Sequence, residues 1–189
     1  MERLEEERLA LAAQEQVTRI AAKSDLLFAD EAIRIVEFVD YRCGYCARGA
    51  ADVATLSEVE QRAIRIVELP ILGEASTDLA KVALGVRNTA GEDAYRAFHF
   101  AVFERAGRVG SRALALRLAE ELGHDRAAID RASLAPDVAE EINRNLALAR
   151  SLGISGTPAF VSPTKLHEGL MELAELRQII NDEEKPNDQ

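Results

Sequence analysis

The chain has 189 residues, of which 48% are hydrophobic and 30% charged, as in an ordinary globular protein. Its net charge of −10 argues against nucleic acid and against an anionic membrane surface as partners, because proteins that bind either one present basic patches. No apolar run approaches the roughly 18 residues of a membrane span, and residues 1–8 show neither the basic nor the apolar region of a signal peptide. The sequence therefore fits a cytosolic protein, or one from which a targeting segment has been removed.

Residues 2–23 are expected to form a helix, since good helix formers dominate and neither Gly nor Pro interrupts them. Apolar and small residues follow a 4-3-4-3 spacing at Ala13, Val17, Ile20, Ser24 and Leu27, which makes a short heptad pattern. The pattern fits an amphipathic helix packed on its own domain and, equally, an oligomerisation segment over residues 1–25. At the other end, the acidic residues 183–189 are expected to be a disordered tail.

Two strands and a helix are predicted next. Residues 33–39 are apolar on both faces apart from Glu37, as in a central strand. Cys43 begins a helix that runs to about residue 60, and residues 63–69 form a second strand that ends before Pro70. A strand, a helix and a strand in this order indicate a parallel, right-handed βαβ unit.

Residues 76–152 are predicted to be wholly helical, with four helices that start at Ser76 or Thr77, after Gly91, at Ser111 and at Pro136. Short strands at 158–161 and 165–168 follow, and then an amphipathic helix over 170–181. The hairpin and helix would close the sheet begun by the first two strands. The expected organisation is thus an α/β domain formed by residues 26–75 and 153–182, interrupted by a helical insertion at 76–152.

The chemistry of the chain centres on Cys43-Gly44-Tyr45-Cys46, which contains the only two cysteines. One bridge over so short a loop stabilises a fold very little, so a chemical role is favoured. Residues i and i+3 at a helix start lie on the same side, and the unpaired N–H groups there stabilise a thiolate. Cys43 is therefore predicted to be the nucleophile, and Cys46 to resolve the mixed disulfide.

Two further features support redox chemistry. Pro158 follows Gly156-Thr157 at the start of a strand, which suits a tight turn and allows a cis bond. A cis-proline loop beside the cysteines would leave the backbone of Thr157 free to pair with an extended substrate chain. A trans proline at a strand start is the alternative. Glu37 is the one acid in an apolar strand and could accept the proton that Cys46 loses when it attacks. The alternative is an acid that reaches solvent at a strand end.

Two other classes of protein fit the same residues. A zinc site would need two more ligands, and the three histidines, His99, His124 and His167, show no paired-ligand spacing. A peptide-binding, chaperone-like module with incidental cysteines could hold unfolded chains between the sheet and the helical insertion. We predict no metal site.

Four segments in this order resemble the DsbA-like family of bacterial thiol–disulfide oxidoreductases: residues 38–46 (FVDYRCGYC), 70–73 (PILG), 95–99 (YRAFH) and 153–161 (GISGTPAFV). The resemblance covers about residues 33–180. It implies a thioredoxin-like fold with an inserted all-helical subdomain, preceded here by the N-terminal helix. It also implies that Pro158 is cis, that Cys43 is an exposed nucleophile, that Glu37 is a buried acid, and that the protein works outside the cytoplasm, in the periplasm.

The dipeptide between the cysteines refines this expectation. The strongest oxidases of the family carry Pro-His there, whereas Gly44-Tyr45 with Thr157 before the proline resembles the disulfide isomerases. We therefore expect a protein disulfide oxidoreductase that leans to isomerase or oxidase work, with a thioredoxin-like reductase as the alternative. Gly44, Tyr45, Thr157 and Pro158 would bind substrate. Unfolded or misoxidised proteins are the expected substrates, a membrane redox partner is expected, and the only redox group would be the Cys43–Cys46 disulfide.

Overall fold

The computed structural model describes residues 2–30, 32–59, 63–105 and 107–183. In this part of the chain a four-stranded sheet has the order β2-β1-β3-β4. Strand β1 (Ile33–Val39) pairs in parallel with β2 (Ala63–Glu68), which confirms the βαβ unit. Strands β3 (Ala159–Val161) and β4 (Leu166–Glu168) form an antiparallel hairpin, and β3 also pairs antiparallel with β1.

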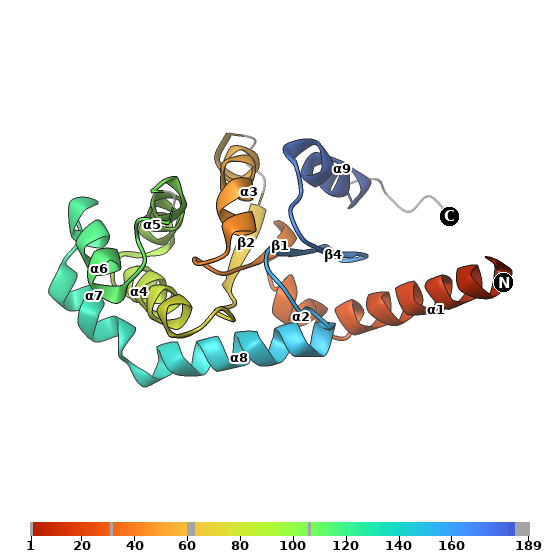
Figure 1. Ribbon diagram of the computed structural model, residues 1–189, viewed down its shortest axis with the longest axis horizontal. Coiled ribbons are helices and arrows are strands. Elements are labelled where there is room, and N and C mark those ends of the chain that lie inside the picture. Colours follow the sequence, from red (N-terminus) through yellow and green to blue (C-terminus); the bar gives the residue numbers. More distant parts are fainter. Residues whose placement is uncertain (1, 31, 60–62, 106, 184–189) are drawn as a thin grey trace.

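Nine α-helices surround or extend this sheet in the described residues (Figure 1). They are α1 (Glu2–Ala21), α2 (Ser24–Leu27), α3 (Gly44–Ala54), α4 (Glu74–Ala90), α5 (Glu92–Glu104), α6 (Arg112–Glu121), α7 (Arg126–Ser133), α8 (Pro136–Leu152) and α9 (Leu173–Glu183). A π-helical turn, Thr55–Val59, continues α3. The predicted helix from Cys43 to about residue 60 is thus an α-helix followed by this wider turn.

The two faces of the sheet bury different helices. Because side chains alternate along a strand, Val36 and Phe38 of β1 pack with the end of α1, with α2 and with α8. Ile35 on the opposite face packs with α3, the π-helical turn and α9, and Val39 packs around both cysteines. Figure 1 shows this sandwich, with α8 along one side of the sheet and α3 and α9 on the other. The fold is a thioredoxin-like α/β fold with a helical insertion.

The insertion differs in two details from the predicted helices. Helix α4 begins at Glu74, after Gly73 with φ of 109°, and not at Ser76 or Thr77. A fifth helix, α7, begins after Asp125, whose carboxylate accepts hydrogen bonds from the backbone N–H groups of Ala127 and Ala128. This side-chain cap stabilises the N-terminus of α7, so a short helix forms although its residues make no long apolar pattern.

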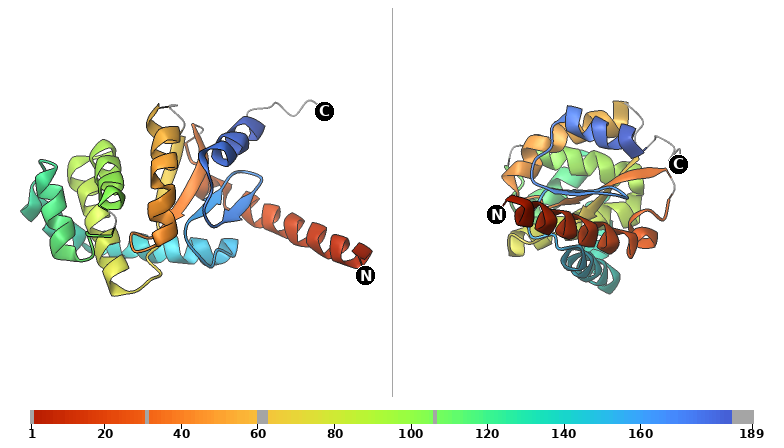
Figure 2. Two further views of the ribbon diagram at one scale, coloured as in Figure 1. Left: turned by 45° about the horizontal axis from the view of Figure 1, so that its top comes forward. Right: turned by 90° about the vertical axis from the view of Figure 1, so that its right-hand side faces the viewer.

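Helix α1 forms as predicted but extends away from the domain (Figures 1 and 2). Residues 3–19 are exposed apart from half-buried Gln16, and only Ile20 and Leu27 of the heptad positions are buried. The expectation that this helix packs along its own domain is therefore met only at its last turn. No helix of the described residues has the length and apolarity needed to cross a membrane. Helix α9 reaches Glu183, so it includes the first residue of the predicted tail, and residues 184–189 lie outside the described part.

Candidate active site

Cys43 lies at the N-terminus of α3, in a turn that Asp40 holds in place. The backbone N–H of Cys43 donates to the Asp40 carbonyl at 3.0 Å, and the N–H of Arg42 donates to Asp40 Oδ1 at 2.7 Å. The other oxygen, Oδ2, accepts from the N–H groups of Ile71 and Leu72 at 2.8 and 3.0 Å. One buried carboxylate thus fixes the cysteine turn to the loop that follows β2.

The two sulfurs occupy the positions that the spacing predicted. Cys43 is the N-cap of α3, and its Sγ accepts from the backbone N–H of Cys46 at 3.4 Å. Cys46 is 1% exposed and faces the sheet. Cys43 is only 7% exposed, so the expectation of an exposed nucleophile is wrong for this conformation. The cause is the neighbouring loop, which covers the sulfur.

That covering loop contains Thr157 and Pro158, joined by a cis peptide bond as the resemblance implied. The Sγ of Cys43 lies 3.1 Å from the Thr157 carbonyl oxygen, to which the thiol donates. Glu168 of β4 anchors the loop from below, because its Oε1 accepts from the backbone N–H groups of Ser155 and Gly156. No sequence pattern indicated this role for Glu168. The structure therefore brings together two segments that are 114 positions apart in the chain.

The surroundings of the two cysteines shift the pKa values of their thiols in opposite directions. A hydrogen bond from the Cys46 thiol, assisted by hydrogen bonds from Thr157 and from the N–H groups of Tyr45 and Cys46, lowers the pKa of Cys43 to about 5. Partial burial opposes this shift, as does the Thr157 carbonyl, which can accept only from the neutral thiol. For Cys46 the same hydrogen bond and burial raise the pKa well above its ordinary value. Cys43 is thus the thiolate, and Cys46 keeps its proton.

Glu37 lies beneath the cysteine pair in β1. It is 3% exposed, which rules out the alternative of an acid that reaches solvent. Ile35 and Val39, two residues before and after Glu37, face the side of the sheet that α3 covers, so Glu37 faces that side too. Burial and, to a lesser extent, the charges of Glu68 and Cys43 raise the pKa of Glu37 to about 8, against the opposing charge of Arg96. A carboxyl with this pKa can exchange a proton near neutral pH.

Gly44 and Tyr45 form the open rim of the site. A side chain at Gly44 would meet nothing within 4 Å, so space lies next to Cys43 on this side. Tyr45 is 56% exposed, and the guanidinium of Arg48 lies 4.3 Å from the centre of its ring. This rim is the accessible approach to a sulfur that Thr157 otherwise covers.

A buried polar cluster beside the site was missed from the sequence. Glu68, the last residue of β2, accepts hydrogen bonds on Oε1 from the hydroxyls of Tyr41 at 2.9 Å and Tyr95 at 2.7 Å. The Tyr41 hydroxyl also lies 3.1 Å from Nδ1 of His99. The signal that identified Glu37, an acid inside an apolar strand, applies equally to Glu68.

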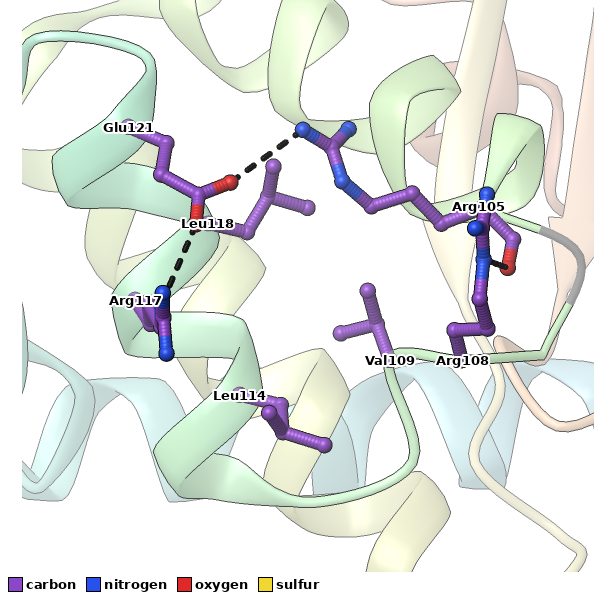
Figure 3. A pocket seen from close by; sticks show the side chains of 7 residues that line it. All are labelled: Arg105, Arg108, Val109, Leu114, Arg117, Leu118 and Glu121. Carbon is purple, nitrogen blue, oxygen red and sulfur yellow. Dashed lines mark hydrogen bonds and ion pairs between the residues drawn. The ribbon is translucent and has the colours of Figure 1, made fainter.

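Elsewhere the described residues contain a separate cavity of about 310 Å³ between the end of α5 and α6 (Figure 3). Arg105 and Arg117 both pair with Glu121 at its rim, and Val109 and Leu118 contribute apolar surface. None of the predicted site residues lines it. Among the described side chains, no three of the His, Cys, Asp and Glu type are placed to share a metal ion.

Comparisons with known proteins agree with this site. Residues 34–181 match the family described as the DSBA-like thioredoxin domain. No protein of curated function matches the chain in sequence.

Three solved structures illustrate the similarity. The thiol-disulfide exchange protein alpha-DsbA2 from Wolbachia pipientis is 26% identical with a TM-score of 0.80, over 91% of this chain and 97% of that one. A thioredoxin-like oxidoreductase from Silicibacter pomeroyi DSS-3 is 34% identical with a TM-score of 0.73, over 84% and 96%. ScsC from Proteus mirabilis, in a transitional conformation, is 26% identical with a TM-score of 0.75, over 96% and 86%. The chain therefore belongs to the DSBA-like thioredoxin-domain family of thiol–disulfide oxidoreductases, with its two-cysteine site at Cys43 and Cys46.

Proposed function

We propose that this protein exchanges disulfides in protein substrates through Cys43 and Cys46, as an isomerase or oxidase in the periplasm. The observation that carries the proposal is the position of Cys43 at the start of α3, with a lowered pKa and with Sγ against the Thr157 loop. The Cys43 thiolate attacks a substrate disulfide. A new S–S bond to Cys43 forms, and one substrate sulfur leaves as a thiolate that takes a proton from solvent.

Resolution of this mixed disulfide falls to Cys46. Its sulfur attacks Cys43 Sγ, the Cys43–Cys46 bond forms, and the second substrate sulfur leaves. The Cys46 proton must be lost in this step, and Glu37, whose charge acts on Cys46, is an acid of suitable pKa on the same face of the sheet. In the opposite direction, a substrate thiolate attacks Cys43 of the disulfide, and Cys46 leaves with a proton from Glu37.

The substrate chain would bind along the loop opposite the cysteines. The backbone of Thr157 borders Sγ of Cys43, so residues that flank the substrate cysteine would run beside it and Pro158. Gly44 leaves room for the substrate sulfur, and the exposed Tyr45 ring offers apolar contact. A short extended segment with a cysteine fits this arrangement.

The isomerase direction rests on residues 1–25 as a self-association segment. Helix α1 leaves Val17 40% exposed and Leu11 60% exposed, and a long exposed helix gains stability when it packs on something. Association would hold several Cys43 sites around one space and shield them from a membrane partner that oxidises them. The Gly44-Tyr45 dipeptide, which resembles that of the disulfide isomerases, points the same way.

Light scattering tests the self-association. The full chain should exceed the mass of one copy, and a form that begins at Thr18 should run as a monomer. This truncation keeps Ile20, which is buried in the domain and would be lost from a form that begins at Ser24. If both forms are monomeric, α1 has another role, and a monomeric oxidase is the better interpretation.

Reduction of insulin by a thiol reductant tests the exchange activity itself. The wild type should accelerate it, Cys43→Ala should not, and Cys46→Ala should accumulate a mixed disulfide with substrate. A peptide-binding module with incidental cysteines would behave alike in all three forms, and that result would refute the proposed activity.

A further inference from the structure

The side chains of the polar cluster around Glu68 are buried. Glu68, Tyr95 and His99 are each 1% exposed, and Tyr41 is 5% exposed. Burying such groups is costly unless they are hydrogen-bonded. Within the cluster, Oε1 of Glu68 accepts two hydrogen bonds, whereas Oε2 of Glu68 has no hydrogen-bond partner in the described part of the chain. Apolar side chains at this place would avoid the cost of burying polar groups, which favours a chemical role for the cluster.

The direction of the hydrogen bonds shows where charge resides. Tyr41 and Tyr95 have one hydroxyl hydrogen each, and both point at Oε1 of Glu68. Because the Tyr41 hydrogen is used in this way, His99 must donate to the Tyr41 oxygen through Nδ1. A neutral imidazole suits this, since burial lowers the pKa of His99 to about 3. The chain of donors ends at Glu68, which is the arrangement that stabilises a carboxylate.

Glu68 and Glu37 are neighbours on one face of the sheet. In the parallel ladder Glu37 pairs with Ile66 and Val39 pairs with Glu68. Paired residues project to the same face, so the two carboxyls lie diagonally across β1 and β2, below α3 and α5. Two neighbouring carboxyls in an apolar environment do not both ionise readily, and the one whose carboxylate accepts more hydrogen bonds ionises first.

The two acids differ in how they are held. Burial raises the pKa of Glu68 to about 8, whereas the two hydroxyl donors on its Oε1 and the charge of Arg87 favour the carboxylate and limit this rise. Oε2 of Glu37 has no hydrogen-bond partner among the described residues, and the negative charge of Glu68 opposes its ionisation. Arg96 works in the other direction on Glu37, but it acts through space, while the tyrosine hydroxyls contact Glu68 directly. Glu68 therefore gives up its proton first.

Several further charged or titratable groups surround the pair. Asp40, Cys43 and Cys46 face it from the turn after β1 and from α3. Arg87, Tyr95, Arg96 and His99 face it from α4 and α5, and Glu141 of α8 pairs with Arg87 at 2.5 Å. Burial and the charge of Glu68 raise the pKa of both tyrosines, so they stay donors throughout the working range.

We propose that Glu68 is a positioning residue of the exchange reaction: it ionises before Glu37, because Tyr41 and Tyr95 donate to its carboxylate, and its charge then keeps Glu37 protonated, ready to protonate Cys46. This inference rests on the proposed function. When a substrate thiolate attacks Cys43 of the disulfide, the Cys43–Cys46 bond breaks and a substrate–Cys43 bond forms. Cys46 leaves with the electron pair and takes the proton of Glu37, which becomes a carboxylate. Glu68 touches none of the reacting atoms and acts only through Glu37.

Carbon-13 NMR of the glutamate carboxyls tests the order of ionisation in the oxidised protein, where neither cysteine titrates. Assignment uses Glu37→Gln and Glu68→Gln. Glu68 should titrate at lower pH than Glu37, and the Glu37 midpoint should fall by about one pH unit or more in Glu68→Gln. The reverse order, or an unmoved midpoint, overturns the proposal. This measurement does not depend on activity, so it stands apart from a failure of the proposed function.

The kinetic test follows the reaction of the oxidised protein with 2-mercaptoethanol, with rates divided by the thiolate concentration. The wild-type rate should decrease at pH values above the Glu37 midpoint. In Glu68→Gln this decrease should begin about one pH unit lower, or lower still. In Glu37→Gln the profile should be flat, and adding Glu68→Gln should not change it further. A uniform loss of rate at every pH, with no shift, would make Glu68 merely structural. Tyr95→Phe provides a second variant, with a smaller shift in the same direction.

Discussion

The ionisation of Cys43 can be followed by ultraviolet absorbance of the thiolate and by the rate of alkylation. With a pKa of about 5, Cys43 is about 90% thiolate at about pH 6, whereas an ordinary thiol of pKa about 8.5 is about 0.3% thiolate there. The lower basicity makes the thiolate roughly fortyfold less reactive, for a Brønsted slope of about 0.45. We therefore expect alkylation at about pH 6 to be roughly eightfold faster than for a free cysteine peptide, and to level off where the peptide's rate still rises.

A matched pair of variants tests the cause. The largest contribution to the lowered pKa is the hydrogen bond from the Cys46 thiol. Cys46→Ser keeps a donor at this position and should leave the Cys43 pKa low, while Cys46→Ala should raise it toward the ordinary value. The helix N-terminus still lowers it in both. A wild-type Cys43 that titrates between about 8 and 9 would falsify the reasoning, as would equal pKa values in the two variants.

The same shift predicts how stability depends on pH. Because the pKa of Cys43 is lower in the folded than in the unfolded reduced protein, the stabilisation is fully present above the unfolded value of about 8.5. It is lost as pH falls toward about 5. The oxidised protein lacks this group, so the excess stability of the reduced form, measured by urea unfolding, should shrink between these limits. A difference in stability between the reduced and oxidised forms that does not change with pH would contradict the lowered pKa of Cys43.

Three other variants have expected outcomes. Glu37→Gln should slow resolution of mixed disulfides, measured by quenched-flow, and leave the thermal unfolding midpoint near that of the wild type; an unchanged rate between about pH 6 and 8 demotes Glu37 to a structural residue. Gly85→Ala should lower the free energy of unfolding by about 1–3 kcal/mol, because a Cβ there would lie 2.9 Å from the Ile129 carbonyl oxygen and Ser133 Cβ; equal urea midpoints would show that α7 yields. Asp40→Ala should lower the free energy of unfolding by about 1.5–3 kcal/mol or more, because buried N–H groups lose a charged acceptor. A smaller decrease, measured from urea unfolding curves of equal slope, would mean that water replaces the carboxylate.

The sequence pattern correctly predicted the elements that depend on interactions between residues close together in the chain. The apolar strand at 33–39, the helix that begins after Cys43 and the short hairpin before the last helix all formed as expected. Pro158 and Cys43 were placed side by side only through the family resemblance. Spacing alone says nothing about a contact between two segments so far apart in the chain.

The features that the sequence did not predict depend on long-range packing. Glu68 stands in its strand much as Glu37 does, but its importance depends on hydroxyls from Tyr41 and Tyr95, which only the folded chain brings to it. The burial of Cys43 depends on the Thr157 loop in the same way. Helix α7 was missed because its eight residues form too short a periodic pattern, although Asp125 is a typical N-cap residue.

The bonds of Asp40 have a mechanical consequence. Its carboxylate is shared between the turn before Cys43 and the N–H groups of Ile71 and Leu72, at the place where the chain crosses into α4. The helical insertion therefore cannot swing away from the sheet as a rigid body without pulling on the turn that carries the nucleophile. Hydrogen exchange at Arg42 and at Leu72 should report one shared opening event. A partner protein that binds the helical insertion could therefore change the position of the Cys43 sulfur without contacting it.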